Sequence, residues 1–114
     1  MNNITNIENS KSIKTTGTSL IGYVDTTYEE LCKAFGEPTY KEPSGDGKVQ
    51  KEWNLEFEDA DGNVTVATIY DYRAGKFGYR EPGYRWHVGG FEYDALELVE
   101  EALSMFRTRA MAEY

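Results

Sequence analysis

Apolar and polar residues alternate along residues 49–58, which predicts a strand with side chains of opposite character on its two faces. The apolar face comprises Val49, Trp53, Leu55 and Phe57. The polar face comprises Gln50, Glu52, Asn54, Glu56 and Glu58. Asp61-Gly62 is a pair typical of hairpin turns, so residues 64–72 are predicted to return as the adjacent strand. The first of these strands is expected to have one buried face and one acidic, solvated face, whereas the returning strand is apolar on both faces and is expected to be central.

Two segments follow the period of an α-helix. Residues 24–38 are predicted to contain the first helix and its caps, with Asp25 or Thr26 as the N-cap, Gly36 as the stop signal and Pro38 just beyond it. Its apolar stripe comprises Tyr28, Leu31, Cys32 and Phe35. The second helix is predicted to begin at Asp94 and to end near residue 111. Because Cys32 lies on an apolar face beside two glutamates, we expect a structural thiol and not a nucleophile.

The remaining elements complete an α+β architecture. Residues 84–88 alternate again and predict a third strand, with Tyr70, Trp86 and Val88 in the core of the sheet, while residues 18–24 predict a short first strand. The order β-α-β-β-β-α predicts an antiparallel three- to four-stranded sheet packed against two helices. We expect residues 17–114 to form this single domain. Residues 1–16, polar with isolated isoleucines, are expected to be a flexible arm, with ordering on a partner as the alternative.

The charge balance limits the classes of partner. The 114 residues include 12 Lys and Arg against 20 Asp and Glu, a formal net charge of -8. General nucleic-acid binding is not expected, because it requires a net basic surface. One cysteine excludes an internal disulfide, and the N-terminal residues include no apolar run, so we expect no membrane segment and a cytoplasmic location. The unpaired edge strands of a small sheet can pair with a second copy of the chain, so a homodimer is one expected state.

Recognisable catalytic patterns are absent from the sequence. One histidine and one cysteine cannot supply a zinc site, and no nucleophile elbow or phosphate-binding glycine loop occurs. We therefore predict a protein that is not an enzyme and that uses no cofactor or metal.

Residues 69–91 combine aromatic residues, basic residues and glycines more densely than the rest of the chain. The loop over residues 73–83 is longer and more basic than a hairpin requires. If it folds back over the following strand, it places cations beside aromatic faces, an arrangement able to bind a nucleotide or a partner protein. The candidate residues are Arg73, Lys76, Phe77, Tyr79, Arg80, Tyr84, Arg85 and His87. The alternative is that the aromatics fill the core and the cations neutralise the acidic strand.

Two resemblances extend this interpretation. The pattern T-x-x-E-L-x-x-x-F-G-x-P, followed by a strand with Trp53 and a D-G turn, resembles the repeat of the BamE/SmpA outer-membrane lipoproteins and of the β-lactamase inhibitor protein. It spans about residues 25–72 and implies only a layered sheet-and-helix module. The blocks GTSLIGYVDTTYEELCKAFGEP, GDGKVQKEW, VATIYDYR and WHVGG resemble a set of small uncharacterised proteins encoded by bacteriophages and prophages. The second resemblance implies a phage accessory protein.

The expected function is therefore non-enzymatic inhibition of a host antiviral-defence component, in the manner of an anti-CRISPR or similar protein. The acidic strand face with Glu52, Glu56 and Glu58, or the aromatic and basic loop, is expected to contact the host protein. One alternative is a protein that sequesters a nucleotide-type signalling molecule through the loop. Another is a virion or assembly component.

Overall fold

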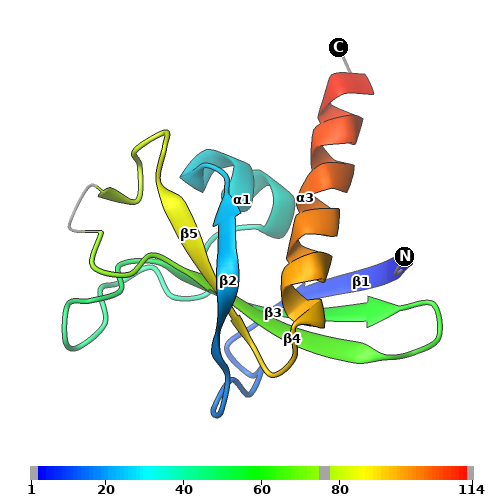
Figure 1. The fold of residues 1–114 in the computed structure, drawn as a ribbon, viewed down its shortest axis with the longest axis horizontal. Helices are drawn as coiled ribbons and strands as arrows, with labels where there is room; N and C mark the ends of the chain where they lie inside the picture. Colours follow the sequence, from blue (N-terminus) through cyan, green and yellow to red (C-terminus); the bar gives the residue numbers. More distant parts are fainter. Residues whose placement is uncertain (1–2, 75–77, 113–114) are drawn as a thin grey trace.

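The computed structural model describes residues 3–74 and 78–112 and contains an antiparallel sheet with two helices (Figure 1). The elements are β1 (Ile4–Asn9), β2 (Ser19–Asp25), α1 (Tyr28–Phe35), β3 (Glu52–Asp59), β4 (Val64–Tyr70), β5 (Arg85–Gly90) and α3 (Asp94–Ala112). The sheet has five strands in the order β1-β3-β4-β5-β2. The predicted α+β class is confirmed, with one strand more than expected.

The predicted β3–β4 hairpin forms, but β3 begins at Glu52, three residues later than predicted, and Val49 lies outside the strand and the core. Trp53 pairs with Ile69 and Leu55 pairs with Ala67, so the apolar positions of both strands share one face. The turn is fixed by the carboxylate of Asp59, whose Oδ1 accepts the backbone N–H groups of Asp61 and Asn63, each at 2.9 Å.

Hydrogen bonds at its two ends determine where helix α1 begins and ends. Its N-cap is Thr27, whose hydroxyl accepts the Glu30 N–H at 3.1 Å, so the prediction of Asp25 or Thr26 was wrong by at least one residue. Thr26 instead donates its hydroxyl to the Glu30 carboxylate at 2.5 Å and is buried. The predicted stop at Gly36 is confirmed, because this residue adopts φ 86° and donates its N–H to the Cys32 carbonyl at 2.9 Å.

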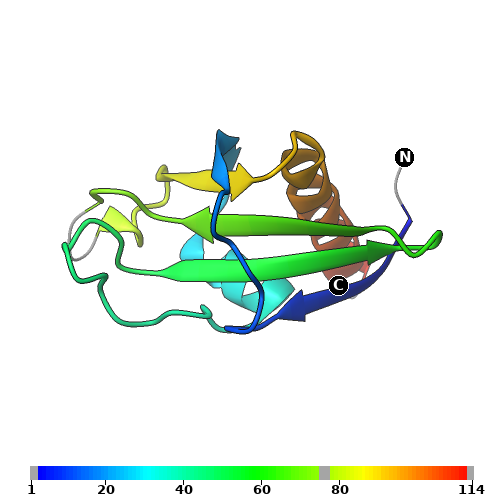
Figure 2. The same ribbon diagram turned by 90° about the horizontal axis from the view of Figure 1, so that it is seen from below.

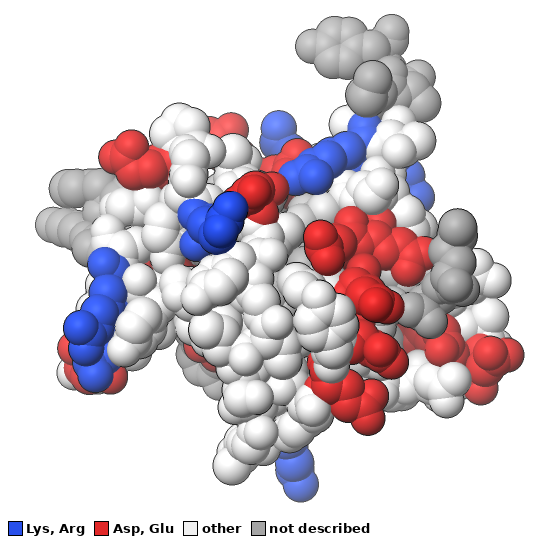
Figure 3. Space-filling view, in the orientation of Figure 1, with Lys and Arg blue, Asp and Glu red and all other residues white. Residues whose placement is uncertain are grey.

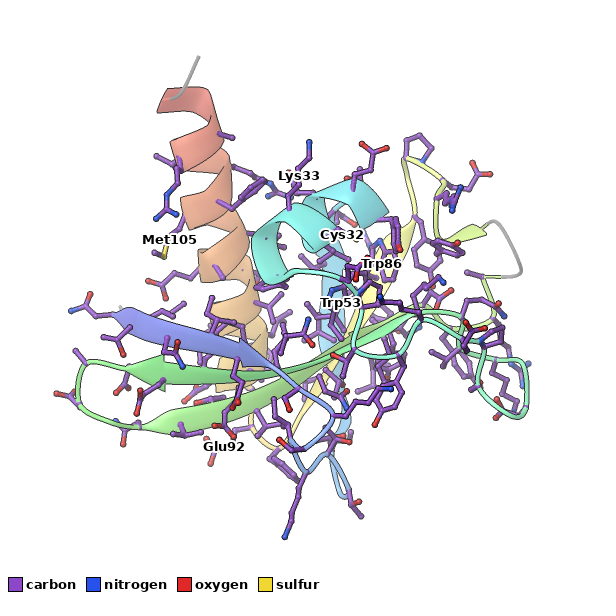
Figure 4. The ribbon with its side chains drawn as sticks, turned by 180° about the vertical axis from the view of Figure 1, so that it is seen from behind. Cys32, Lys33, Trp53, Trp86, Glu92 and Met105 are labelled. Carbon is purple, nitrogen blue, oxygen red and sulfur yellow. The ribbon has the colours of Figure 1, made fainter. Side chains whose placement is uncertain are left out.

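Both helices cover the same face of the sheet, and the hydrophobic core lies between these layers. Trp53 and Trp86 are fully buried, lie under α1 (Figure 4) and meet edge to face, with 5.5 Å between ring centroids. The predicted core positions Trp86 and Val88 are confirmed. Tyr70 is half-buried outside this core, so its assignment to the core was wrong: it pairs with His87 on the other face.

The N-terminal residues expected to form a flexible arm contain strand β1, which pairs with β3 at the edge of the sheet. The pairing register shifts between Ile4 and Asn6, which inserts Thr5 as an extra residue. The bulge lets Ile4 and Ile7, three residues apart, both pack against the core. A period of two does not fit that spacing, and for this reason the strand was missed.

The connection between β1 and β2, residues 10–18 and here termed the crossover, runs across the sheet face opposite the helices (Figure 2). It must cross a face because its two strands lie at opposite edges. Ile13 is only 7% exposed yet does not belong to the core between the helices and the sheet. Asn54 and Thr68 on β3 and β4 are 2% and 4% exposed. The expectation of a wholly solvated polar face was therefore wrong at Asn54.

The close approach of α3 to β5 predicts that Gly90→Ala destabilises the fold. A Cβ at Gly90 would lie 2.7 Å from the Ala95 Cβ, and the short alanine side chain cannot rotate away. We expect the free energy of unfolding, measured by urea denaturation, to fall by about 1–3 kcal/mol. Gly83→Ala is the control, since nothing lies within 4 Å of its Cβ. Equal stability of the two variants would contradict the packing described.

Candidate functional site

The sheet face opposite the helices, here termed the open face, consists of rows of paired residues. One row runs Tyr40, Glu52, Tyr70, His87, Tyr23 across the sheet. The next row runs Asn54, Thr68, Gly89, Leu20, and its first two members are buried. The third row runs Glu8, Glu56, Val66, and beyond it Glu58 pairs with Val64. The buried row separates an aromatic half (Tyr23, Tyr40, Glu52, Tyr70, Tyr72 and His87) from an acidic half (Glu8, Glu56, Glu58, Val64 and Val66).

The acidic half contains like charges in direct opposition. Glu8 on β1 lies opposite Glu56 on β3, and Glu58 follows two residues later on the same face. Like charges facing each other across paired strands are destabilising. Among residues 3–74 and 78–112 the ion pairs are Lys41–Glu37, Arg85–Asp25 and Arg107–Glu30, and none includes a carboxylate of the acidic half. The repulsion is therefore not offset by an ion pair within the described chain.

His87 lies at the centre of the aromatic half. Its ring stacks on Tyr70 at 5.3 Å between centroids and meets Tyr23 and Tyr72 at 5.0 and 5.7 Å. Burial lowers the pKa of His87, and the nearby Asp71 carboxylate opposes this shift only in part. The imidazole is therefore neutral at neutral pH, and it does not add a cation to this face.

Asp71 is a polar residue that the sequence analysis did not single out. It is fully buried, and its Oδ1 accepts the backbone N–H groups of Gln50 and Lys51, each at 2.8 Å. Its Oδ2 has no hydrogen-bond partner among the described residues, and burial raises the pKa of the carboxyl group. Asp71 fixes the segment before β3 to the end of β4. A single aspartate between two tyrosines gave no signal of that role.

The basic residues proposed from sequence are dispersed. The Arg85 Nε lies 3.1 Å from an Asp25 carboxylate oxygen, and the Arg73 guanidinium lies 5.4 Å from the Tyr72 ring centroid. The Arg80 guanidinium lies 5.5 Å from the centroid of Tyr79. Lys76 is outside the described residues. The structure therefore does not gather the described cations into one site.

The proposed aromatic residues are also divided. Tyr79 is buried in the core, with its ring 5.1 Å from that of Tyr28. Tyr84 packs edge to face on Trp86, and its hydroxyl accepts the Tyr72 N–H at 2.9 Å. Phe77 lies outside the described residues. Of the aromatic and histidine candidates, only His87 is described on the open face.

A cavity of about 450 Å³ lies beside the crossover, at the end of the aromatic half. Its lining comprises Lys11, Thr15, Tyr40, Lys41, Glu42, Pro43, Ser44, Val49, Gln50, Glu52 and Asn54. Glu52 was proposed from sequence, and burial raises the pKa of its carboxyl group. The other two proposed carboxylates, Glu56 and Glu58, lie in the acidic half, across the buried row. Sequence reasoning missed the cavity because three separate segments form it.

Neither a cluster of metal ligands nor a membrane-spanning helix occurs among the described residues. No group of three or more His, Cys, Asp or Glu side chains is placed to hold a metal ion there. No described helix is long and apolar enough to cross a membrane. Burial raises the pKa of the Cys32 thiol, which disfavours the reactive thiolate.

Comparisons with protein-family models, with curated proteins and with solved structures return no match.

The surroundings of His87 predict a pH effect that can be measured on one residue. It is the only histidine, so its ring signals in a proton NMR titration need no assignment. We expect a pKa below the ordinary 6.5. Because the folded-state pKa is lowered, the stabilisation is complete above pH 6.5 and is lost as the pH falls through the folded-state value.

The variant His87→Gln isolates this effect, since its side chain is neutral at every pH. Its free energy of unfolding should fall less than that of the wild type between pH 7 and pH 5. A measured pKa above 6.5 would contradict the effect of burial on His87.

Proposed function

We propose that the protein is a non-enzymatic binding protein whose open face docks on a basic surface of a partner protein. The observation that carries this proposal is the acidic half, where Glu8 opposes Glu56 beside Glu58 with no described ion pair. A partner that supplies lysine or arginine side chains removes this repulsion on binding. Complementary charge of this kind also steers the partner during association.

Acidic side chains also gather over α3 and the connection before it (Figure 3), but those at the start of α3 have a structural explanation. Asp94 and Glu97 lie in the first turn of α3, where carboxylates are stabilised by the positive end of the helix dipole. The carboxylates of the acidic half lie on strands and gain no such stabilisation. Binding therefore accounts for the acidic half better than for the α3 carboxylates.

The aromatic half supplies a second kind of contact on the same face. Tyr23, Tyr40 and Tyr72 are 47%, 41% and 40% exposed, and tyrosine is enriched among the residues that dominate binding energy at protein interfaces. The strands β3 and β4 contribute to both halves, so their relative position is fixed by the sheet. One partner can therefore contact the carboxylates and the tyrosines together.

The partner that we propose is a host antiviral-defence component, which the protein inhibits by occupying its surface. The resemblance of four sequence blocks to phage and prophage proteins supports this choice. Sequestration of a nucleotide through the loop of residues 73–83 has less support, because Arg73, Arg80 and Arg85 each contact a different neighbour.

The proposal predicts that charge reversal in the acidic half abolishes inhibition. The protein is expressed in bacterial strains that each carry one defined defence system, and each strain is infected with a phage that its system restricts. We expect plaque formation to be restored in at least one strain. The double variant Glu56→Lys, Glu58→Lys should lose this effect by at least about tenfold, as expected for the loss of charged contacts at an interface.

The matched control is Glu100→Lys, Glu101→Lys, which makes the same change in net charge on α3 at positions that are not buried and lie beyond the first turn. It should restore plaques as the wild type does. Equal loss in both double variants would indicate a response to net charge alone. If the wild-type protein restored plaques in none of the strains, inhibition of those defence systems would be contradicted.

A further inference from the structure

Two hydrogen-bond acceptors in the cavity beside the crossover lack a described donor. Asn54 is 2% exposed and its Oδ1 has no hydrogen-bond partner among residues 3–74 and 78–112. Glu52, two residues before it on the same face of β3, is half-buried and forms no ion pair within those residues. Burial leaves the Asn54 oxygen without a donor and raises the pKa of the Glu52 carboxyl group. A group that offers only donors and carries a positive charge satisfies both.

An aromatic ring adjoins these acceptors. Tyr40 and Glu52 exchange two backbone hydrogen bonds, of 3.0 and 3.1 Å, so their side chains are neighbours on one face. The Lys11 ammonium already lies 5.5 Å from the centroid of the Tyr40 ring, which shows that this ring can hold a cation. The second lysine of the lining, Lys41, is paired with Glu37 at 2.6 Å.

We propose that this cavity receives an arginine side chain of the partner, with its guanidinium on Glu52 and Asn54 and against the Tyr40 ring. The inference rests on the proposed function, because it assigns one anchor residue of the basic partner. Guanidinium is planar, has five N–H donors and no acceptor, and stacks on aromatic rings. Lysine supplies the charge but not the planar face. The incoming arginine displaces Lys11 from Tyr40.

The test is a two-dimensional amide NMR titration of the full chain with N-acetyl-arginine amide. The side-chain amide of Asn54 and the backbone amides of Tyr40 and Glu52 should shift and reach saturation. The citrulline analogue, which has the same shape without the charge, should leave these signals unchanged. Glu52→Gln should weaken arginine binding roughly tenfold, as expected for a lost charged hydrogen bond. Glu100→Gln, at an exposed position of α3, should leave the affinity unchanged.

The variant Lys11→Gln distinguishes a cavity that binds cations from a cavity that binds anions. It removes the internal competitor for the Tyr40 ring, so arginine should bind roughly threefold more tightly. A nucleoside monophosphate, titrated in parallel, should cause no saturable shift. The inference is overturned if arginine causes no saturable shift, if citrulline matches arginine, or if a nucleotide binds and Lys11→Gln weakens it. Unchanged thermal unfolding of each variant confirms that the cavity remains folded.

Failure of the arginine anchor can be distinguished from failure of the proposed function. Loss of plaque restoration in Glu56→Lys, Glu58→Lys together with a flat arginine titration supports the binding face and rejects the arginine anchor. A saturable arginine titration together with full activity of that double variant rejects the acidic half and retains the cavity.

Discussion

The structure depends on the placement of its first two strands at opposite edges of one sheet. Because α1 and α3 cover one face, the crossover occupies the other, and Ile13 is buried there. Two consequences follow. The crossover covers the row of Asn54 and Thr68, which divides the open face into an acidic and an aromatic half. It also contributes one wall of the cavity in which Glu52 and Asn54 lie.

The regular parts of this arrangement could be predicted from the sequence. The alternation around Trp53 predicted β3 and its buried face, the Asp61-Gly62 turn predicted β4, and Gly36 marked the end of α1. These signals are local, because each is carried by residues close together in the chain. Strand β1 was missed because its bulge gives the two isoleucines a spacing of three, which matches neither a regular strand nor a long helix.

The site was less predictable than the fold because its members come from distant segments. Glu52 and Glu56 were proposed together as one acidic surface, yet the buried row lies between them. Tyr79 was proposed as a contact residue because it belongs to a basic, glycine-rich loop, but it packs against Tyr28 in the core. Neither the path of the crossover nor the direction of that loop is encoded in a periodic pattern. His87 lies on the sheet face away from Trp86, as the strict alternation of a strand requires for adjacent residues.

The acidic half retains a repulsion between Glu8 and Glu56 that folding alone would not favour. Glu56→Lys tests it directly, because it replaces the like-charge pair with Glu8 by an opposite-charge pair. Urea denaturation should show this variant to be more stable than the wild type by about 0.2–1 kcal/mol at low salt, and the gain should shrink as salt is added. A variant that is equally stable or less stable at low salt would contradict the claim.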